Sequence, residues 1–260
     1  MDLNQQLTAR YIEVLEATDR DFIATLNAYR IKPGNGLNDL FLPTVSANYS
    51  TAARKVMVMG RETRTWNYAA AANSRSLAEY VTCGMEKHAR YRDSEHCLHS
   101  KTHGSGLIRL LKAVGRATGE AGLIYSNLFA VAHKGKDPRK NLEAWPQVRK
   151  LSGLLLDIQI ETLRPDVIVF ANGIDSAAVR REFFPHANPD DPKAPHRCTG
   201  SDNWKADGIG TGHLWGFTLD NRIQCYRLQH PSAKYYQSNA TKAREHLIKL
   251  LAQNSQATTS

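Results

Sequence analysis

Four polar side chains of types used in catalysis come at or just after the end of a short apolar run. They are Glu62, Asn127, Asn172 and His230. A carboxylate can act as a general base or stabilise a cation, and an imidazole can donate a hydrogen bond to a developing anion. An amide can read the hydrogen-bonding edge of a ligand. Each residue also has a structural alternative, as a loop acid, a turn cap or a histidine before a helix, but together the four predict an active site.

The apolar runs that precede these residues have the length and composition of buried β-strands. Helical periodicity separates the runs, so that strands and helices alternate along the chain. Such alternation favours parallel pairing in a sheet covered on both faces, and polar groups at the carboxyl ends of the strands then meet at one edge. We predict an α/β fold, a three-layer αβα arrangement around a central, four-stranded, mostly parallel sheet with strands at residues 54–59, 123–129, 167–171 and 223–229.

Apolar residues at three- and four-residue spacing predict the helices. The helices are expected at about residues 3–29, from Ser105 to Gly119, and at about 146–163, 175–184 and 237–252. Two long stretches lack this pattern. Residues 61–103 are predicted to be an irregular connection with short helices at 69–72 and 77–81, and residues 185–215 a loop rich in proline, glycine and polar residues.

We divide the chain into a main domain with two terminal additions. The parts are an N-terminal helical cap packed on the main domain (1–52), the α/β domain itself (53–252) and a loose tail (253–260). The chain has 260 residues, of which 42% are hydrophobic, enough for one large core.

The charge of the chain indicates a polyanionic partner. The formal net charge is +9 and the pI is about 9.4, and an excess of lysine and arginine makes DNA or RNA the first candidates. The sequence contains no run that approaches the roughly 18 apolar residues of a membrane span. The N-terminus lacks the basic and apolar regions of a secretory signal. We therefore expect a cytoplasmic, monomeric protein that does not bind membranes.

The cysteines and histidines indicate no metal site. None of the four cysteines forms a C-x-x-C pair, so neither a zinc ribbon nor a disulfide framework is predicted. A cluster of His96, Cys97, His99 and His103 has a spacing that matches no zinc pattern. We expect no metal and no cofactor.

Three short segments resemble the motifs of the uracil-DNA glycosylase superfamily, in the order of that family. Gly60-Arg61-Glu62-Thr63 is similar to its water-activating motif, and His230-Pro231-Ser232 to the motif that supplies a histidine and a minor-groove loop. Ser126-Asn127-Leu128 resembles the segment whose asparagine reads the base. The resemblance covers roughly residues 54–251, of which about a dozen positions are specific.

The resemblance implies a DNA glycosylase that flips a base out of the helix and hydrolyses its N-glycosidic bond. Glu62 would position or deprotonate water, His230 would stabilise the departing base, and Asn127 would read that base. Other residues are implied as aromatic partners of the flipped base or as contacts to DNA. The candidates for base stacking are Trp66, Tyr68 and Phe129, and those for DNA contact are Lys134, Lys136, Arg139, Lys140, Ser232 and Lys234, with Tyr235 and Tyr236 as possible wedges.

The sequence departs from the family pattern in ways that bear on the substrate. Thr63 replaces the usual proline of the first motif, Glu62 replaces aspartate or asparagine, and the tyrosine that enforces uracil specificity in the best-known branch is missing. The superfamily also resembles, in parts, a phage-defence glycosylase that removes glucosylated hydroxymethylcytosine. We therefore expect a modified cytosine in phage DNA, and so antiviral defence, ahead of uracil repair.

Two further classes of function compete with this interpretation. One is a DNA-binding protein without catalytic activity on the same fold, in which the basic loop after residue 132 carries the function. The other is an unrelated α/β hydrolase that acts on nucleotides or another small glycoside. A serine-hydrolase version of the latter is disfavoured because the chain has no G-x-S-x-G elbow.

Overall fold

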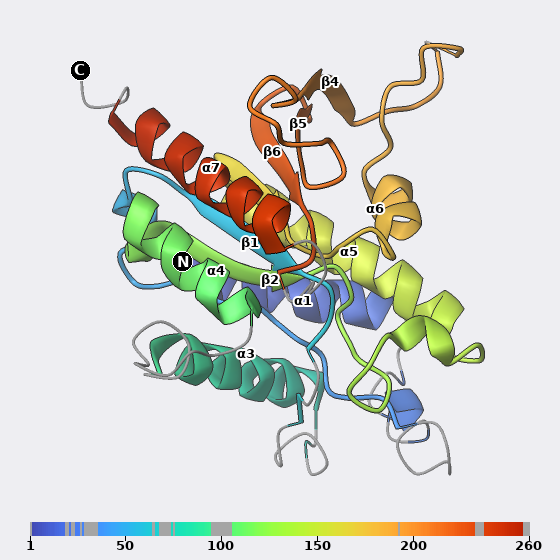
Figure 1. Ribbon diagram of the computed structural model, residues 1–260. Helices are drawn as coiled ribbons and strands as arrows, with labels where there is room; N and C mark the ends of the chain where they lie inside the picture. Colours follow the sequence, from blue (N-terminus) through green and yellow to red (C-terminus); the bar gives the residue numbers. More distant parts are fainter. Residues whose placement is uncertain are drawn as a thin grey trace. The chain divides into compact units, whose positions relative to one another are not determined.

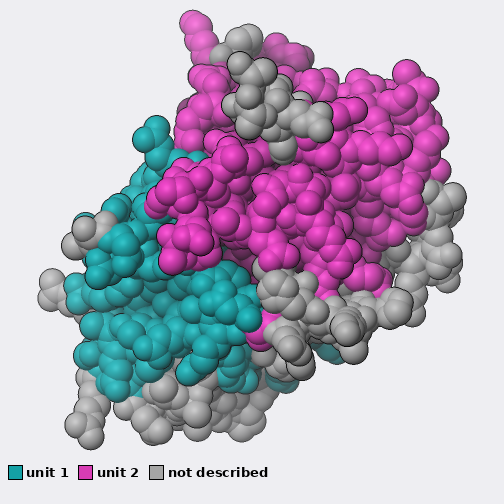
Figure 2. Space-filling model, turned by 90° about the vertical axis from the view of Figure 1, so that its left-hand side faces the viewer, with its two compact units in different colours: residues 1–45, 61–93, 126–164 teal, residues 46–60, 94–125, 165–260 magenta. Residues whose placement is uncertain are grey.

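The structure is a computed structural model of the chain. The residues that it describes are 2–18, 21, 24–26, 28, 36–63, 66–67, 74, 76–94, 106–191, 193–231 and 237–256. They form two compact units, each assembled from three separate segments (Figure 2). Unit 1 contains residues 1–45, 61–93 and 126–164, and unit 2 contains residues 46–60, 94–125 and 165–260.

The strands form a six-stranded sheet, nearly all of which belongs to unit 2 (Figure 1). In spatial order its strands are β2 (Leu123–Asn127), β1 (Val56–Gly60), β3 (Val167–Phe170), β6 (Ile223–Leu228), β5 (Leu214–Leu219) and β4 (Cys198–Asp202). β1 pairs in parallel with β3, and β3 with β6. β5 is antiparallel to β6, and β4 is antiparallel to β5. The α/β class and the mostly parallel sheet are confirmed, and the four expected strands are all present.

The prediction of four strands was wrong, because β4 and β5 extend the sheet. β4 lies within the stretch expected to be a loop. Of its five residues only Cys198 is buried, so this edge strand has no apolar pattern of its own. Backbone pairing with β5 holds it in place, and that partner is not visible in the local sequence.

The helices of unit 2 pack on its part of the sheet. They are α4 (Gly106–Thr118), α6 (Ala177–Phe183) and α7 (Gln237–Gln256), with the short 3₁₀ helices η1 (Tyr49–Thr51) and η4 (Glu120–Gly122). α4 contacts α7 and β1, and α7 also contacts β5 and β6. α7 continues to Gln256, beyond the expected start of a tail, and residues 257–260 lie outside the described residues.

Unit 1 is built around three helices. They are α1 (Leu3–Thr18), α3 (Leu77–Asp93) and α5 (Trp145–Leu163), with the 3₁₀ helix η5 (Pro138–Lys140). α1 packs against α3 and α5 and buries Leu7, Tyr11 and Leu15, one turn apart. The stretch 61–103 was expected to be irregular, with short helices at 69–72 and 77–81. The second of these is the start of the 17-residue α3, and residues 69–72 lie outside the described residues. Within the described part of the chain, no helix is long and apolar enough to cross a membrane.

Candidate functional site

The strand ends place three of the four predicted polar residues at equivalent positions. Glu62 follows the end of β1 by two residues, Asn172 follows β3 by two, and His230 follows β6 by two. β1, β3 and β6 are parallel neighbours, and the amide of Ala171 donates to the carbonyl oxygen of Met59 at 2.9 Å. The carboxyl ends of these strands therefore form one edge of the sheet, the usual place for a ligand in an open α/β fold.

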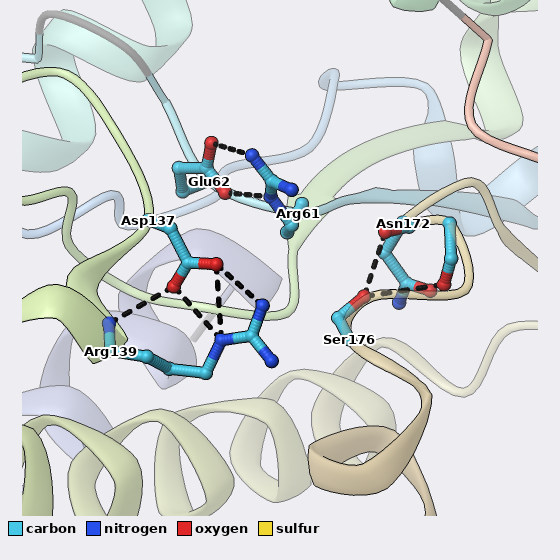
Figure 3. Close-up of polar contacts among 7 residues, drawn as sticks. Arg61, Glu62, Asp137, Arg139, Asn172 and Ser176 are labelled. Atoms are coloured by element: carbon cyan, nitrogen blue, oxygen red, sulfur yellow. Dashed lines mark hydrogen bonds and ion pairs between the residues drawn. The ribbon is translucent and has the colours of Figure 1, made fainter. Parts of the chain in front are cut away.

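In unit 1, the carboxylate of Glu62 is held by the guanidinium of its neighbour Arg61. Arg61 Nη2 donates to Glu62 Oε1 at 2.9 Å, and Arg61 Nε donates to Glu62 Oε2 (Figure 3). The Glu62 side chain is only 7% exposed and that of Arg61 is 25% exposed. The backbone oxygen of Arg61 also accepts a hydrogen bond from the amide of Phe129 at 2.9 Å. The loop after β1 is thus fixed to the segment after β2, and Glu62 has a defined orientation.

A second ion pair lies in the basic loop of unit 1. Asp137 accepts hydrogen bonds from the backbone amide and from Nε of Arg139 at 3.0 Å, and from its Nη2 at 2.5 Å (Figure 3). Burial raises the pKa of Asp137. The hydrogen bonds and charge of Arg139, together with the charge of Arg61, lower this pKa by a larger amount, so that the net shift is downward. Arg139, predicted to contact phosphate, is therefore engaged with Asp137. The other three predicted contacts, Lys134, Lys136 and Lys140, are exposed.

Asn127, at the end of β2, has a buried amide without a partner. The residue is 4% exposed, and neither its Oδ1 nor its Nδ2 forms a hydrogen bond within the described chain. The Oγ1 atom of Thr63, also in unit 1, is likewise buried and unpaired among these residues. The preceding Ser126 differs, because its Oγ donates to Gln159 Oε1 at 2.6 Å. Among the described residues, Asn127 thus has an unused donor and an unused acceptor.

In unit 2, the loop after β3 lies against His230. Gly173 has φ +78°, and a Cβ atom at this position would be 3.0 Å from His230 Cβ. Ser176 Oγ fixes the loop by donating to the backbone oxygen of Asn172 at 2.7 Å (Figure 3). Asn172 is 1% exposed, and both of its side-chain amide atoms lack a partner among the residues described. The structure therefore brings together Asn172, Gly173 and His230.

The two described aromatic candidates for base stacking are packed in the protein interior. Phe129 is fully buried, with its ring centroid 5.4 Å from that of Trp145 in an edge-to-face contact. Trp66 is buried with edge-to-face contacts to Phe41 at 4.8 Å and Tyr91 at 5.6 Å. This packing favours a role in the core over base stacking. The remaining candidates lie outside the described residues: Tyr68, Ser232, Lys234, Tyr235 and Tyr236.

The sequence did not predict the ion-pair partners of Glu62 and Arg139. Asp137 is the N-cap of η5, with Pro138 at the first helical position, and this Asp-Pro pair is a recognisable helix-start signal. The pairing of Arg61 with Glu62 had no such signal, since adjacent side chains in an extended segment usually point apart.

Metal ligands do not gather in the part of the chain that is described, where no group of three or more histidine, cysteine or acidic residues is placed to hold an ion. The cluster of His96, Cys97, His99 and His103 lies outside the described residues.

The scan against models of protein families matches none for this chain, and the search of the curated proteins finds no match. The resemblance to the uracil-DNA glycosylase superfamily therefore rests on the short motifs around Glu62, Asn127 and His230, and membership stays a prediction.

Proposed function

We propose that this protein is a DNA glycosylase, which hydrolyses the N-glycosidic bond of a flipped-out base and leaves an abasic site. The observation that carries this proposal is the buried, unpaired amide of Asn127. In the same unit the nearly buried carboxylate of Glu62 is fixed in orientation by Arg61. An amide that reads a base and a carboxylate that acts on its sugar are the two functions that the reaction requires.

The unpaired amide supports a ligand because leaving it unpaired is costly. A buried donor or acceptor without a partner destabilises a protein by about 1–3 kcal/mol, and Asn127 has one of each. The edge of a pyrimidine offers a complementary donor and acceptor. Cytosine and uracil present them in opposite order, and rotation of the amide by 180° exchanges its own two groups. Asn127 thus fits either base, and the choice between them has to come from other contacts.

In the proposed hydrolysis, Glu62 activates water and His230 stabilises the departing base. The bond between C1′ and the base nitrogen breaks, the base departs with the electron pair, and water supplies the new oxygen on C1′. Glu62 orients that water, accepts its proton and offsets the positive charge of the oxocarbenium-like sugar. Both carboxylate oxygens accept from Arg61, but each has a second lone pair with which to hold water. His230 donates a hydrogen bond to the departing base.

We propose as substrate a modified cytosine in phage DNA, with glucosylated hydroxymethylcytosine as the first candidate and uracil as the alternative. The support for the modified base is the departure of the Gly60–Thr63 segment from the uracil-specific pattern. The support for DNA is the net charge of +9 together with the exposed lysines 134, 136 and 140. Removal of such a base from invading DNA would constitute antiviral defence.

The test scores abasic sites in two DNAs, one that contains uracil and one that contains glucosylated hydroxymethylcytosine. Glu62→Gln is expected to lower the rate by about 10²–10⁴-fold, the usual contribution of a positioned acid or base. Glu86→Gln, at an exposed position of α3 in the same unit, is the control and should keep full activity. Cleavage of the uracil DNA alone would reject the modified base, and cleavage of neither DNA would reject both substrates.

One observation favours a second function, DNA binding without catalysis. Both oxygens of Glu62 already accept hydrogen bonds from Arg61, as expected for a purely structural ion pair. In that case Glu62→Gln leaves the biological activity unchanged, whereas charge reversal at Lys134, Lys136 and Lys140 abolishes it. The two functions therefore predict opposite results for the same substitution.

A further inference from the structure

A cluster of cationic side chains lies on one face of the sheet in unit 2, apart from the residues used above. Phe170 of β3 pairs with Arg227 of β6, and Arg227 pairs in turn with Trp215 of β5. Side chains at directly paired positions point to the same face of a sheet. Arg180 of α6 lies over this face, with its guanidinium carbon 5.9 Å from the centroid of the Phe170 ring. The helix thus brings a fourth charged or aromatic group to the same place.

Arg180 is a buried cation whose hydrogen bonds are incomplete. It is 2% exposed, and its Nε and Nη1 atoms have no acceptor among the residues described. Arg227 is buried too, but it donates to the carbonyl oxygen of Gly212 at 2.9 Å and to that of Thr211. Burial, followed by the positive charges of Arg227 and Arg181, lowers the pKa of Arg180 to about 10. Arg180 therefore remains charged at neutral pH, beside like charges.

His186 adds an uncharged polar group to this cluster. Its ring lies 4.8 Å from that of Trp215 and 4.7 Å from that of Phe217, centroid to centroid. Its Nε2 atom is buried and unpaired within the described chain. Burial, with the charges of Arg180 and Arg181, lowers the pKa of His186 to about 4, so that the ring is neutral near pH 7. A neutral ring can offer either a donor or an acceptor at Nε2.

The contrast with Arg197 shows what Arg180 lacks. Arg197 also lies over a ring, 5.3 Å from the centroid of Phe184, and belongs to the same unit. Its Nε and Nη2 atoms donate to the two carboxylate oxygens of Asp220 at 3.0 Å and 2.8 Å. A buried cation is normally retained when such an anion compensates it. Arg180 has the more buried position and no such carboxylate on its Nε and Nη1.

We propose that Arg180, Arg181, Arg227 and His186 form a binding site for a small phosphate-group anion. The planar guanidinium fork matches the oxygens of a phosphate, which can accept from Nε and a terminal nitrogen at once. Inorganic phosphate or a phosphate monoester, as a dianion, also offsets more of the positive charge of three arginines than a carboxylate does. The exposed Arg181 provides the first contact from solvent. The Nε and Nη1 atoms of Arg180, which have no acceptor among the described residues, complete the site. The site is independent of the proposed glycosylase activity.

Thermal unfolding of the full chain in inorganic phosphate, compared with chloride at equal ionic strength, tests this site. Wild-type protein at a phosphate concentration about a hundred times the dissociation constant is expected to show a Tm higher by roughly 5 °C, with saturation. Arg180→Met should abolish the saturable part of the shift without lowering the Tm in chloride, because it removes an uncompensated charge. Arg197→Met, the matched control, should keep the whole phosphate-dependent shift.

Arg181→Met keeps the test decisive if Arg180→Met does not fold, because Arg181 is exposed. It should weaken phosphate binding about tenfold, as expected for loss of one charge-assisted hydrogen bond. A short oligonucleotide distinguishes the source of the phosphate group: competition with inorganic phosphate assigns a DNA phosphate, and no competition assigns a free phosphate. A phosphate-dependent shift that does not saturate, or that is equal in wild type and Arg181→Met, would overturn the proposal.

Discussion

The ion pair between Arg61 and Glu62 allows a quantitative prediction. At about 4 Å and an effective dielectric constant of about 20, two opposite unit charges attract by about 4 kcal/mol. Part of this gain offsets the desolvation of both groups, and Arg61 is still 25% exposed, which screens the interaction. We therefore expect Arg61→Gln to lower the free energy of unfolding by about 2–3 kcal/mol, since it leaves a carboxylate that is only 7% exposed without its guanidinium.

A double-mutant cycle separates this pair from other effects of each substitution. Arg61→Gln, Glu62→Gln and the double variant are unfolded in urea, and the unfolding free energies are compared with that of the wild type. The expected coupling energy is about 2 kcal/mol, so the double variant should lose about 2 kcal/mol less than the sum of the losses of the two single variants.

Arg92 and Asp93 provide a matched control in the same unit. They are also adjacent in sequence and share two hydrogen bonds, of 2.6 Å and 2.8 Å, but Asp93 is 62% exposed. A pair whose carboxylate is exposed to this extent is worth about 0.2–1 kcal/mol. If the coupling of Arg61 with Glu62 is no larger than that of Arg92 with Asp93, the argument from burial is refuted, and Glu62 is not held by Arg61 in solution.

Two further predictions concern the stability of unit 2. His186 has a pKa of about 4 in the folded protein against 6.5 for the free side chain, so protons bind the unfolded chain first as pH falls. Between pH 6.5 and 4 the urea midpoint should fall by the equivalent of about 1–2 kcal/mol, after allowance for partial exposure of the ring. His186→Gln should flatten this dependence, whereas a change at the exposed His196 should not; an unchanged slope in His186→Gln would contradict the assignment. Gly122→Ala should cost several kcal/mol or prevent folding, because its Cβ would lie 1.8 Å from the backbone oxygen of Arg54, whereas Gly212→Ala, with nothing within 4 Å, should be nearly neutral. Equal stability of the two alanine variants would show that the backbone at Gly122 gives way.

The sequence by itself was sufficient to predict the positions of the strands and helices that have a continuous apolar pattern. β1, β2 and β3 are buried at every position, so each appears as an unbroken apolar or small-residue run that ends near its true boundary. α5 begins at Trp145, with Pro146 in its first turn, and ends at Leu163, in agreement with the predicted range of 146–163. The positions of Glu62, Asn172 and His230 just after strands followed from these boundaries alone.

Two elements could be identified in full only from the tertiary structure, because the residues that stabilise them lie elsewhere in the chain. β4 is a polar edge strand that depends on β5, and the 17-residue α3 buries only a narrow set of residues that includes Tyr80, Met85 and His88. β4 is mostly polar and α3 mixes polar with apolar residues, so the pattern of burial becomes visible only when the neighbouring elements are in place.

The sequence predicted which residues form the candidate site but not the contacts of their side chains, again because those contacts come from other parts of the chain. Residue types and spacing indicated that Glu62 and Asn127 could do chemistry, but not that one is ion-paired and the other unpaired. The burial of Phe129 and Trp66, which were candidates for stacking on a flipped base, was equally invisible in the sequence. Whether a polar or aromatic group is satisfied depends on which atoms surround it, and segments distant in the sequence supply many of those atoms.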